Sequence, residues 1–201
     1  MKTVFLDRDG VINKDPGGWT KHSYVTEWRD FHFLPGALEA LALLRRSGAR
    51  AIVISNQAGV SKGHFSQKAL DRIDARMRDE VSRSGGAIEA SYYCVHKDED
   101  NCACRKPRTG LLEAAAKKYG VSFNDTYFIG DSRVDIIAGR RAGCRTIFLL
   151  SGKVSSEEMR TWEEKPDHVF DNLLEAVKWV VAKDKRRLRR SRERGKGKGG
   201  P

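Results

Sequence analysis

A short apolar run that meets two aspartates and a glycine constrains this chain most. Val4, Phe5 and Leu6 precede the letters D-R-D-G, in which Asp7 and Asp9 are two residues apart. An apolar run of this length, bounded by a turn signal, is typical of a buried strand. Asp7 would then lie at the carboxyl end of that strand, where open α/β sheets bind their ligands. A strand end capped by a polar turn would have a similar sequence, so the rest of the chain must decide.

Apolar runs alternate with helical patterns along the remainder of the chain. Leu38, Leu41 and Leu44 recur at three-residue spacing, as on the buried face of a helix. Strands are expected near 51–54, 88–93, 126–129, 145–150 and 167–170, and helices near 37–47, 66–83, 110–119, 135–142 and 173–181. This alternation predicts an α/β fold with a doubly wound, mostly parallel Rossmann-like sheet and helices on both faces. A chain of 201 residues suffices for one such core with a small insert, so no large cap domain is expected.

Polar residues follow the strand near 51–54 and would reach the same sheet edge as Asp7. They are Ser55, Asn56 and Gln57. A hydroxyl, amides and exposed backbone N–H groups suit a phosphate, because they supply hydrogen-bond donors without bulk. An ordinary strand-to-loop turn would look similar, so this stretch is informative only together with the acids.

A second pair of acids follows the strand near 126–129. Asp131 would face the same edge as the first pair. Asp135 lies where the next helix begins, so it would cap that helix or steady the ligands of a metal. Cys144, before the following strand, has no metal-binding partner nearby in the sequence and is expected in the core.

Three thiols and an imidazole gather within eleven residues, at Cys94, His96, Cys102 and Cys104. They match a tetrahedral zinc set whose four positions are all filled by protein, which indicates a structural site. Reduced cysteines in a polar loop are the alternative. Arg105 and Lys106 follow directly, and a loop fixed by zinc would hold Lys106 where it could pair with carboxylates and phosphate oxygens.

An aromatic, glycine-containing loop extends from Pro16 to Phe33 and includes Trp19, His22, Tyr24 and Trp28. Its pattern is too irregular for a helix. A loop of this length inside a compact domain is usually functional, and beside the aspartates it would form one wall of a pocket. A surface flap with partly buried aromatic residues is the alternative.

The positive charge of the chain is concentrated at its carboxyl end. The formal net charge is +11, and residues 183–198 hold ten Lys or Arg against two acids, a surplus of +8. We expect residues 1–182 to form the folded domain and residues 183–201 to be a disordered tail able to contact polyanions. No apolar run could span a bilayer, and Met1 and Lys2 lead straight into the first strand, so a cytoplasmic protein is expected.

Taken together, these motifs resemble the haloacid dehalogenase (HAD) superfamily of phosphotransferases over nearly everything before the tail. Within it, D-R-D-G-V, S-N-Q-A-G, the C-x-H and C-x-C pair running into R-K-P, and G-D-S-x-x-D look like one branch. That branch holds the heptose 1,7-bisphosphate phosphatases and histidinol phosphatases. The acidic motifs identify the superfamily, and the cysteine and histidine motif joined to R-K-P narrows it to the branch.

The resemblance implies a mechanism. Asp7 would attack phosphorus and become an aspartyl-phosphate, which divides one hard hydrolysis into two easier steps. Asp9 would protonate the leaving oxygen and then activate water. Mg²⁺ would be held by Asp7, Asp131 and the backbone carbonyl of Asp9, and Zn²⁺ by the cysteines and the histidine.

The resemblance also implies how the substrate is bound. Ser55, Asn56 and Lys106 would clamp the phosphoryl group in the transition state, and Asp135 would support them. The residues expected at the rest of the substrate are Asp15, His22, Ser23, Tyr24, Asn56, Gln57 and Arg105. The expected substrate is a small phosphorylated metabolite, D-glycero-D-manno-heptose 1,7-bisphosphate, which would lose its 7-phosphate to a monomeric enzyme.

Two departures from the branch lie on the substrate side. Ser132 stands where the heptose enzymes usually carry a lysine, and the loop from Pro16 to Trp28 is longer than in shorter members. Histidinol phosphate and other sugar phosphates therefore stay open. A polynucleotide end is a further alternative because the tail is basic, although residues 183–201 contain no aromatic side chain for stacking on bases. An inactive binding module would be suggested by loss of Asp7 or Asp9, and both are present.

Overall fold

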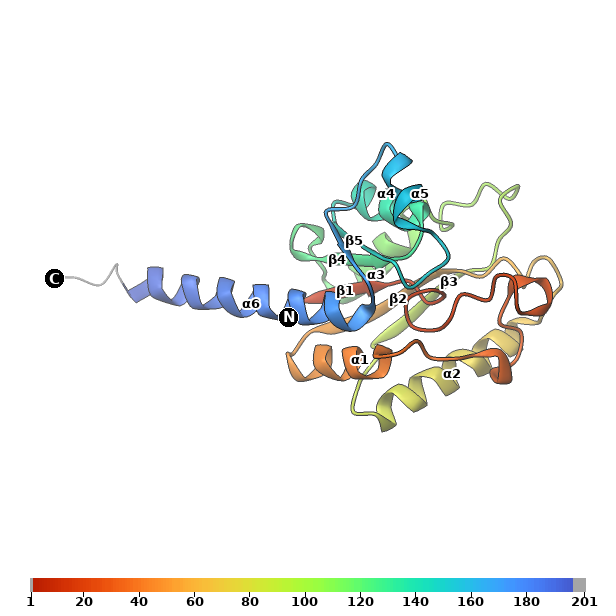
Figure 1. Ribbon diagram of the computed structural model, residues 1–201, viewed down its shortest axis with the longest axis horizontal. Helices are drawn as coiled ribbons and strands as arrows, with labels where there is room; N and C mark the ends of the chain where they lie inside the picture. The colour runs from red at the N-terminus through yellow and green to blue at the C-terminus, as the bar shows by residue number, and fades with distance from the viewer. Residues whose placement is uncertain (1, 197–201) are drawn as a thin grey trace.

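The computed structural model describes residues 2–196. A six-stranded parallel sheet lies at its centre, with the strand order β3-β2-β1-β4-β5-β6 (Figure 1). The strands are β1 (Thr3–Leu6), β2 (Arg50–Asn56), β3 (Ala90–Cys94), β4 (Tyr127–Gly130), β5 (Arg145–Leu149) and β6 (His168–Phe170). The predicted parallel α/β sheet is confirmed. The chain moves outward from β1 to β3 and then from β4 to β6, so the switch between the two halves lies between β1 and β4.

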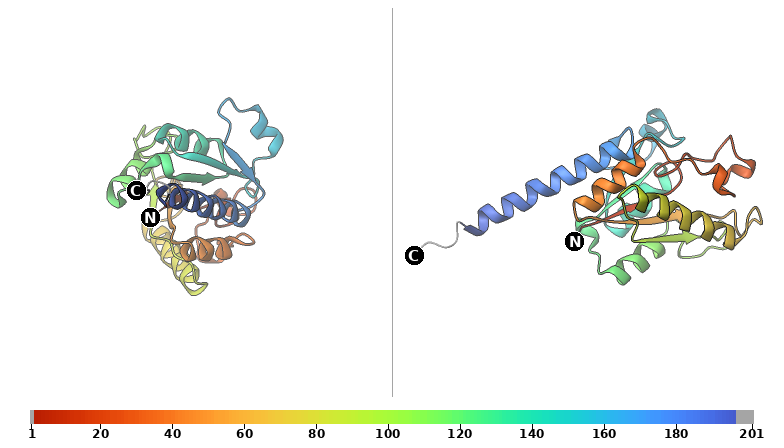
Figure 2. Two further views of the ribbon diagram at one scale, coloured as in Figure 1. Left: turned by 90° about the vertical axis from the view of Figure 1, so that its left-hand side faces the viewer. Right: turned by 90° about the horizontal axis from the view of Figure 1, so that it is seen from below.

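Helices cover both faces of this sheet (Figures 1 and 2). They are α1 (Ala37–Arg46), α2 (Gln67–Arg83), α3 (Gly110–Tyr119), α4 (Arg133–Ala142), α5 (Ser156–Thr161) and α6 (Leu173–Lys196). Short 3₁₀ turns are η1 (Lys21–Ser23), η2 (Trp28–Asp30) and η3 (Phe123–Asp125). Apolar residues of α1, α2 and α6 form one buried cluster, and those of α3, α4 and α5 form clusters on the opposite face.

The first strand shows why the sheet is buried on both sides. Successive strand residues point to opposite faces. Val4 and Leu6 pack into the cluster under α1, α2 and α6, whereas Phe5 packs with Ile52 and Phe128 against α3 and α4. All three β1 side chains have no exposed surface, so β1 is a central strand and its end is held firmly in place.

The helix α5 was not predicted, although its start carries a recognisable signal. The Ser155 side chain accepts a hydrogen bond from the backbone N–H of Glu158 at 3.2 Å. Ser and Glu at this spacing are typical of a helix amino terminus. The same signal, Ser66 accepting from Ala69 N–H at 3.2 Å, confirms the predicted start of α2.

The prediction of disorder from residue 183 onward was wrong for residues 183–196. The helix α6 continues through Lys196 and projects away from the sheet (Figures 1 and 2). Its first turns bury Ala176, Val177 and Val180 against the core. Lys, Arg, Leu and Glu, which dominate the following residues, are good helix formers, and extending an existing helix avoids the cost of a new nucleus. Residues 197–201 of the predicted tail lie outside the described residues.

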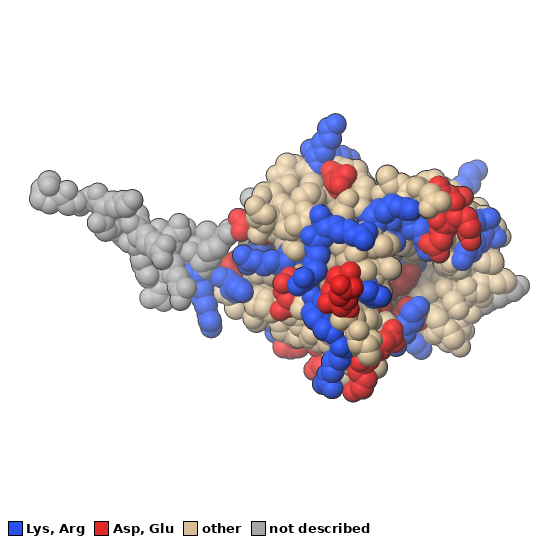
Figure 3. Space-filling view, turned by 90° about the horizontal axis from the view of Figure 1, so that it is seen from above, with Lys and Arg blue, Asp and Glu red and all other residues tan. Residues whose placement is uncertain are grey.

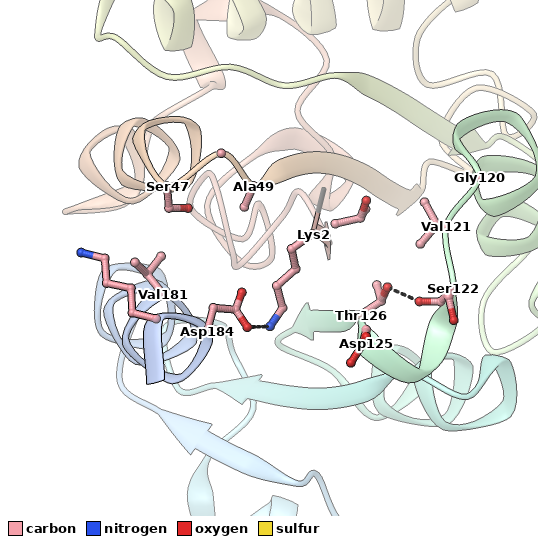
Figure 4. Close-up of a pocket in the computed structure, with 13 residues that line it drawn as sticks. Lys2, Ser47, Ala49, Gly120, Val121, Ser122, Asp125, Thr126, Val181 and Asp184 are labelled. Carbon is pink, nitrogen blue, oxygen red and sulfur yellow. Dashed lines mark hydrogen bonds and ion pairs between the residues drawn. The ribbon is translucent and has the colours of Figure 1, made fainter. Parts of the chain in front are cut away.

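The amino ends of the strands form the opposite edge of the sheet, where a cavity of about 480 Å³ lies between α1, α6 and the connection into β4 (Figure 4). The Lys2 ammonium forms an ion pair with Asp184 of α6, and the Thr126 hydroxyl donates to the Ser122 carbonyl at 2.7 Å. These contacts attach α6 and η3 to the edge that carries no acidic motif. Within residues 2–196, no helix combines the length and the apolar character needed to cross a membrane.

Candidate active site

The ends of β1, β2 and β4, with the loop after β3, bring the predicted catalytic side chains together at the carboxyl edge of the sheet. A cavity of about 510 Å³ opens there. The predicted residues that line it are Asp7, Asp9, Asp15, His22, Ser23, Tyr24, Ser55, Asn56, Lys106 and Asp131. Among the residues that the structure describes, the predicted Gln57 and Arg105 are not part of this lining.

Asp7 lies directly after β1, and its backbone is fixed by the neighbouring strand. Its N–H donates to the carbonyl of Ile129 at 2.9 Å, and its Oδ1 accepts from the Arg8 N–H at 2.7 Å. The residue is only 8% exposed, so one side of the carboxylate faces the cavity. Burial raises the pKa of Asp7 to about 6, which outweighs the lowering effect of Lys106.

Lys106 is a buried cation between two acids. Its Nζ lies 3.0 Å from Asp7 Oδ1 and 2.6 Å from Asp135 Oδ1, and it donates to the Ile54 carbonyl at 2.9 Å. Burial alone would lower the pKa of Lys106, but the charges of Asp135 and Asp7 raise it above its usual range. Lys106 therefore stays charged at the edge where a phosphate would bind.

Asp9 is surrounded by donors from three other residues. The Arg8 guanidinium donates to both of its oxygens at 3.0 and 3.1 Å. Asn13 donates to Oδ1 at 2.8 Å, and Gln57 donates to Oδ2 at 2.7 Å. Arg8 has no exposed surface, so this carboxylate is held by a rigid, buried frame that sequence reasoning did not identify.

The three polar residues at the carboxyl end of β2, of which Ser55 and Asn56 close the strand and Gln57 follows it, make different contacts. Ser55 is buried and lines the cavity beside Asp7. The Asn56 amide donates to the Lys106 carbonyl and accepts from the Lys106 N–H, both at 3.1 Å, so it fastens the lysine loop to β2. Gln57, predicted at the substrate, is fully buried and bonds to Asp9 instead.

Three carboxylates crowd the floor of the cavity. Oxygens of Asp7, Asp131 and Asp135 lie within 4.8 Å of one another. Burial, and then the charges of Asp135 and Asp7, raise the pKa of Asp131 well above its usual range. A divalent cation that prefers oxygen ligands, such as Mg²⁺, would relieve this repulsion, so the residues present fit that ion.

Backbone approaches Asp131 closely from two loops. A Cβ atom on Gly10 or on Gly152 would overlap the Asp131 carboxylate, so neither position has room for a side chain. Gly10 also has a φ of +77°, which favours glycine. The predicted cap is present as well, because Ser132 and Asp135 exchange hydrogen bonds as a capping box at the start of α4.

The cysteines and the histidine converge as the zinc pattern predicts. Cys104 Sγ lies 3.2 Å from Cys94 Sγ, 3.3 Å from Cys102 Sγ and 3.2 Å from His96 Nδ1. With zinc–ligand bonds of about 2.0–2.3 Å, one ion fits among ligands at such separations. Burial, and then the Cys104 thiol, raise the pKa of Cys94 to about 12, so zinc binding here would release a proton.

This cluster, which we call the cysteine knuckle (residues 94–104), adjoins Lys106 in the sequence. Cys94 is the last residue of β3, and its carbonyl accepts from the Gln57 N–H at 2.6 Å. At the other end, the Ala103 carbonyl accepts from the Gly110 N–H at 3.1 Å. Arg105 forms an ion pair with Asp98 of the knuckle, which explains why it does not line the cavity.

The outer wall of the cavity comes from the loop after β1, as predicted. His22 and Ser23 have positive φ values of 64° and 56°, conformations that are uncommon for residues other than glycine. His22 stacks on His64 with ring centroids 4.2 Å apart, and Tyr24 lies beside His64 at 5.5 Å. Ser132, which the sequence placed on the substrate side, also lines the cavity, and the lining residues that sequence reasoning missed are Lys62, His64, Val134 and Lys153.

Comparison with known proteins agrees with this geometry. The HAD-hydrolase-like family model matches residues 103–176. A D-glycero-beta-D-manno-heptose-1,7-bisphosphate 7-phosphatase of Neisseria meningitidis serogroup A is 34% identical, over 90% of this chain and 95% of the relative. The enzyme of the same name from Pseudomonas putida is 35% identical, over 90% of this chain and all of the relative.

A solved structure is similar over the same extent. The D,D-heptose 1,7-bisphosphate phosphatase of B. bronchiseptica, complexed with magnesium and phosphate, superposes with a TM-score of 0.80. It is 29% identical and covers 91% of this chain and 99% of its own. The two relatives match 90% of this chain at 34% and 35% identity, so the chain belongs to the family of D-glycero-beta-D-manno-heptose-1,7-bisphosphate 7-phosphatases, enzymes of the HAD superfamily.

Proposed function

We propose that this protein removes the 7-phosphate of D-glycero-D-manno-heptose 1,7-bisphosphate through an aspartyl-phosphate on Asp7. The observation that carries the proposal is the arrangement at the carboxyl edge of the sheet. There a nucleophile, a buried cation and a second acid face one cavity, in a chain whose relatives carry this activity in their names.

In the first step, an oxygen of Asp7 bonds to phosphorus and the bond from phosphorus to the C7 oxygen breaks. Asp9, which lies two residues after Asp7 in the loop that follows β1, donates a proton to that leaving oxygen. Lys106 and Ser55 lie beside Asp7 and would stabilise the negative charge on the transferring oxygens. Mg²⁺ at Asp7, Asp131 and the backbone carbonyl of Asp9 would supply further positive charge when bound.

In the second step, the Asp9 carboxylate takes a proton from water, and the water oxygen bonds to phosphorus as the bond to Asp7 breaks. This releases inorganic phosphate and regenerates Asp7. The frame of Arg8, Asn13 and Gln57 supports the proposal, because it fixes Asp9 while leaving 17% of its side chain exposed toward the cavity. Asp9 can therefore serve as acid and then as base without moving far.

The outer cavity supports a small, polar substrate. Asp15, His22, Ser23 and Tyr24 offer a carboxylate, an imidazole and hydroxyls, which suit the hydroxyl groups of a sugar. Structural zinc at the cysteine knuckle, a monomeric state and a cytoplasmic location are parts of the same proposal.

A phosphatase screen with Mg²⁺ tests the assignment. The substrates are heptose 1,7-bisphosphate, other sugar bisphosphates, histidinol phosphate and 3′-phosphorylated DNA, each compared by kcat/KM. The heptose bisphosphate should be preferred, with phosphate released from carbon 7. A preference for histidinol phosphate or for the DNA end would overturn the proposed substrate while leaving the chemistry at Asp7 in place.

A further inference from the structure

We propose that Lys153 binds the phosphate that is not hydrolysed and thereby selects bisphosphates over monophosphates. The inference rests on the proposed function, because it assumes a substrate with a second phosphate. Lys153 follows β5, and it lines the same cavity as Asp7 and Asp131.

The loop that carries Lys153 is attached to the catalytic machinery at two points. The Ser151 hydroxyl donates to the Gly10 carbonyl at 2.8 Å, which joins it to the loop after Asp9. Gly152 packs directly on the Asp131 carboxylate, where a Cβ atom would overlap it. These contacts of Ser151 and Gly152 place the backbone of Lys153 beside Asp131. The Lys153 side chain takes no part in them.

The side chain of Lys153 remains available for an anion. Its Nζ lies 3.9 Å from Asp15 Oδ2, at the limit of an ion pair, and 69% of the side chain is exposed. The other oxygen of Asp15 accepts from the Gly17 N–H at 2.7 Å, so Asp15 is fixed while Lys153 is not. A pair this exposed is weak, and a phosphate with two negative charges would compete well for the ammonium.

A second phosphate in this part of the cavity would require a positive charge that the groups beside Lys153 do not supply. Lys106 is engaged by Asp7 and Asp135 and faces the phosphate that reacts. The Ser132 hydroxyl is used in the cap with Asp135. Asp15 would repel a second phosphate unless a positive charge lies next to it, and Lys153 lies next to it.

Steady-state kinetics on four variants test the inference with two probes, heptose 1,7-bisphosphate and heptose 7-phosphate. Lys153→Met should raise KM for the bisphosphate about fivefold or more, with kcat nearly unchanged. KM for the monophosphate should not change. Lys153→Arg should restore the wild-type KM, because it keeps the charge. The control Lys178→Met removes another exposed lysine, one that is paired with Glu175 on α6 away from the cavity, and it should behave as wild type.

The outcomes separate this inference from the proposed function. If the wild type prefers the bisphosphate but Lys153→Met has an unchanged KM for it, the role of Lys153 is overturned and the proposed function stands. The same holds if Lys62→Met, at the other exposed lysine that lines the cavity, shows the selective loss and Lys153→Met does not. A wild type that hydrolyses both probes equally overturns the selection of bisphosphates, and one that hydrolyses neither overturns the proposed function as well.

Discussion

At the scale of single residues, the ammonium of Lys106 is buried between the carboxylates of Asp7 and Asp135, with 2% of its side chain exposed. Removing one partner from such a group leaves charges without compensation in a poorly solvated place. The Asn56 amide holds the same lysine by its backbone, so the side chain has little freedom to move elsewhere. Stability and the proposed catalysis would therefore depend on the same contact.

Replacing Lys106 by Met should lower the free energy of unfolding by about 3–5 kcal/mol at pH 8 without Mg²⁺, because two carboxylates lose their cation. Added Mg²⁺ should recover part of this loss. Chemical denaturation with and without Mg²⁺ measures both effects. Lys62→Met is the control, since Lys62 lines the cavity but is exposed. Equal losses in the two variants would contradict the electrostatic explanation.

The raised pKa of Asp7 predicts how stability varies with pH. Between 3.8 and about 6, the folded protein keeps a proton on Asp7 that the unfolded chain has lost. The free energy of unfolding should therefore fall as pH rises through this window, by at most about 3 kcal/mol from this group. The measurement compares wild type with Asp7→Asn by chemical denaturation without added Mg²⁺. Parallel pH curves for the two proteins would show that Asp7 does not carry the effect.

At the scale of secondary-structure elements, the sequence sufficed for those whose signals are local. Apolar runs located the strands, and the polar residues that follow them marked the sheet edge where the candidate site lies, because parallel strands share one carboxyl edge. The same rule applied to β5 would have pointed to Lys153, which follows that strand by four residues. Contacts between distant loops were harder to predict. Gln57 bonds to Asp9, and Arg105 pairs with Asp98. Both contacts depend on side-chain conformations that only the folded protein defines.

For helix α6, by contrast, the local composition gave the wrong prediction. Composition predicted disorder from Lys183, because the segment has too few apolar residues to bury. Packing of Val177 and Val180 starts the helix, and strong helix formers extend it beyond the sheet. A compositional rule judges a segment alone and misses the support that a neighbouring, anchored segment supplies.

The cysteine knuckle should hold about one zinc ion per chain, which elemental analysis of reduced protein can measure. Cys104→Ser should lose the zinc and most activity, because Lys106 follows the knuckle by two residues, and added Mg²⁺ should not restore it. Cys144→Ala is the matched control: this thiol is buried in the core near Phe5 and Ile52, so its loss should leave zinc content unchanged. Full activity in zinc-free protein would contradict a role for the knuckle in placing Lys106.

At the scale of the whole molecule, the excess positive charge is concentrated near the carboxyl end of the sequence. Lys and Arg side chains alternate with acidic ones on the face shown in Figure 3. By contrast, residues 183–198 carry a surplus of +8 out of a total of +11. The attachment of α6 through Lys2 and Asp184 lies at the edge opposite the candidate active site, and residues 183–186, the part of the basic segment whose side chains the structure describes, do not line that site.

A chain that ends at Arg186 keeps the Lys2–Asp184 ion pair and removes most of the basic segment. It should hydrolyse the heptose bisphosphate about as fast as the full chain. Its binding to a polyanion such as single-stranded DNA should fall, and the binding of the full chain should weaken steeply with salt as counterions are released. Filter binding at several salt concentrations and steady-state kinetics measure the two properties. Loss of catalysis from a folded, truncated chain would make a polynucleotide end the better substrate.

The covalent step at Asp7 is the centre of this account, and reductive trapping tests it most directly. Protein mixed with heptose 1,7-bisphosphate and Mg²⁺ is quenched in acid during turnover and treated with borohydride, which converts an aspartyl-phosphate to homoserine. Peptide mass spectrometry then locates the change. We predict homoserine at position 7, formed only with substrate, and no turnover by a folded Asp7→Asn variant. An unmodified Asp7, modification at Asp9 or Asp131 instead, or appreciable hydrolysis by Asp7→Asn would contradict the mechanism.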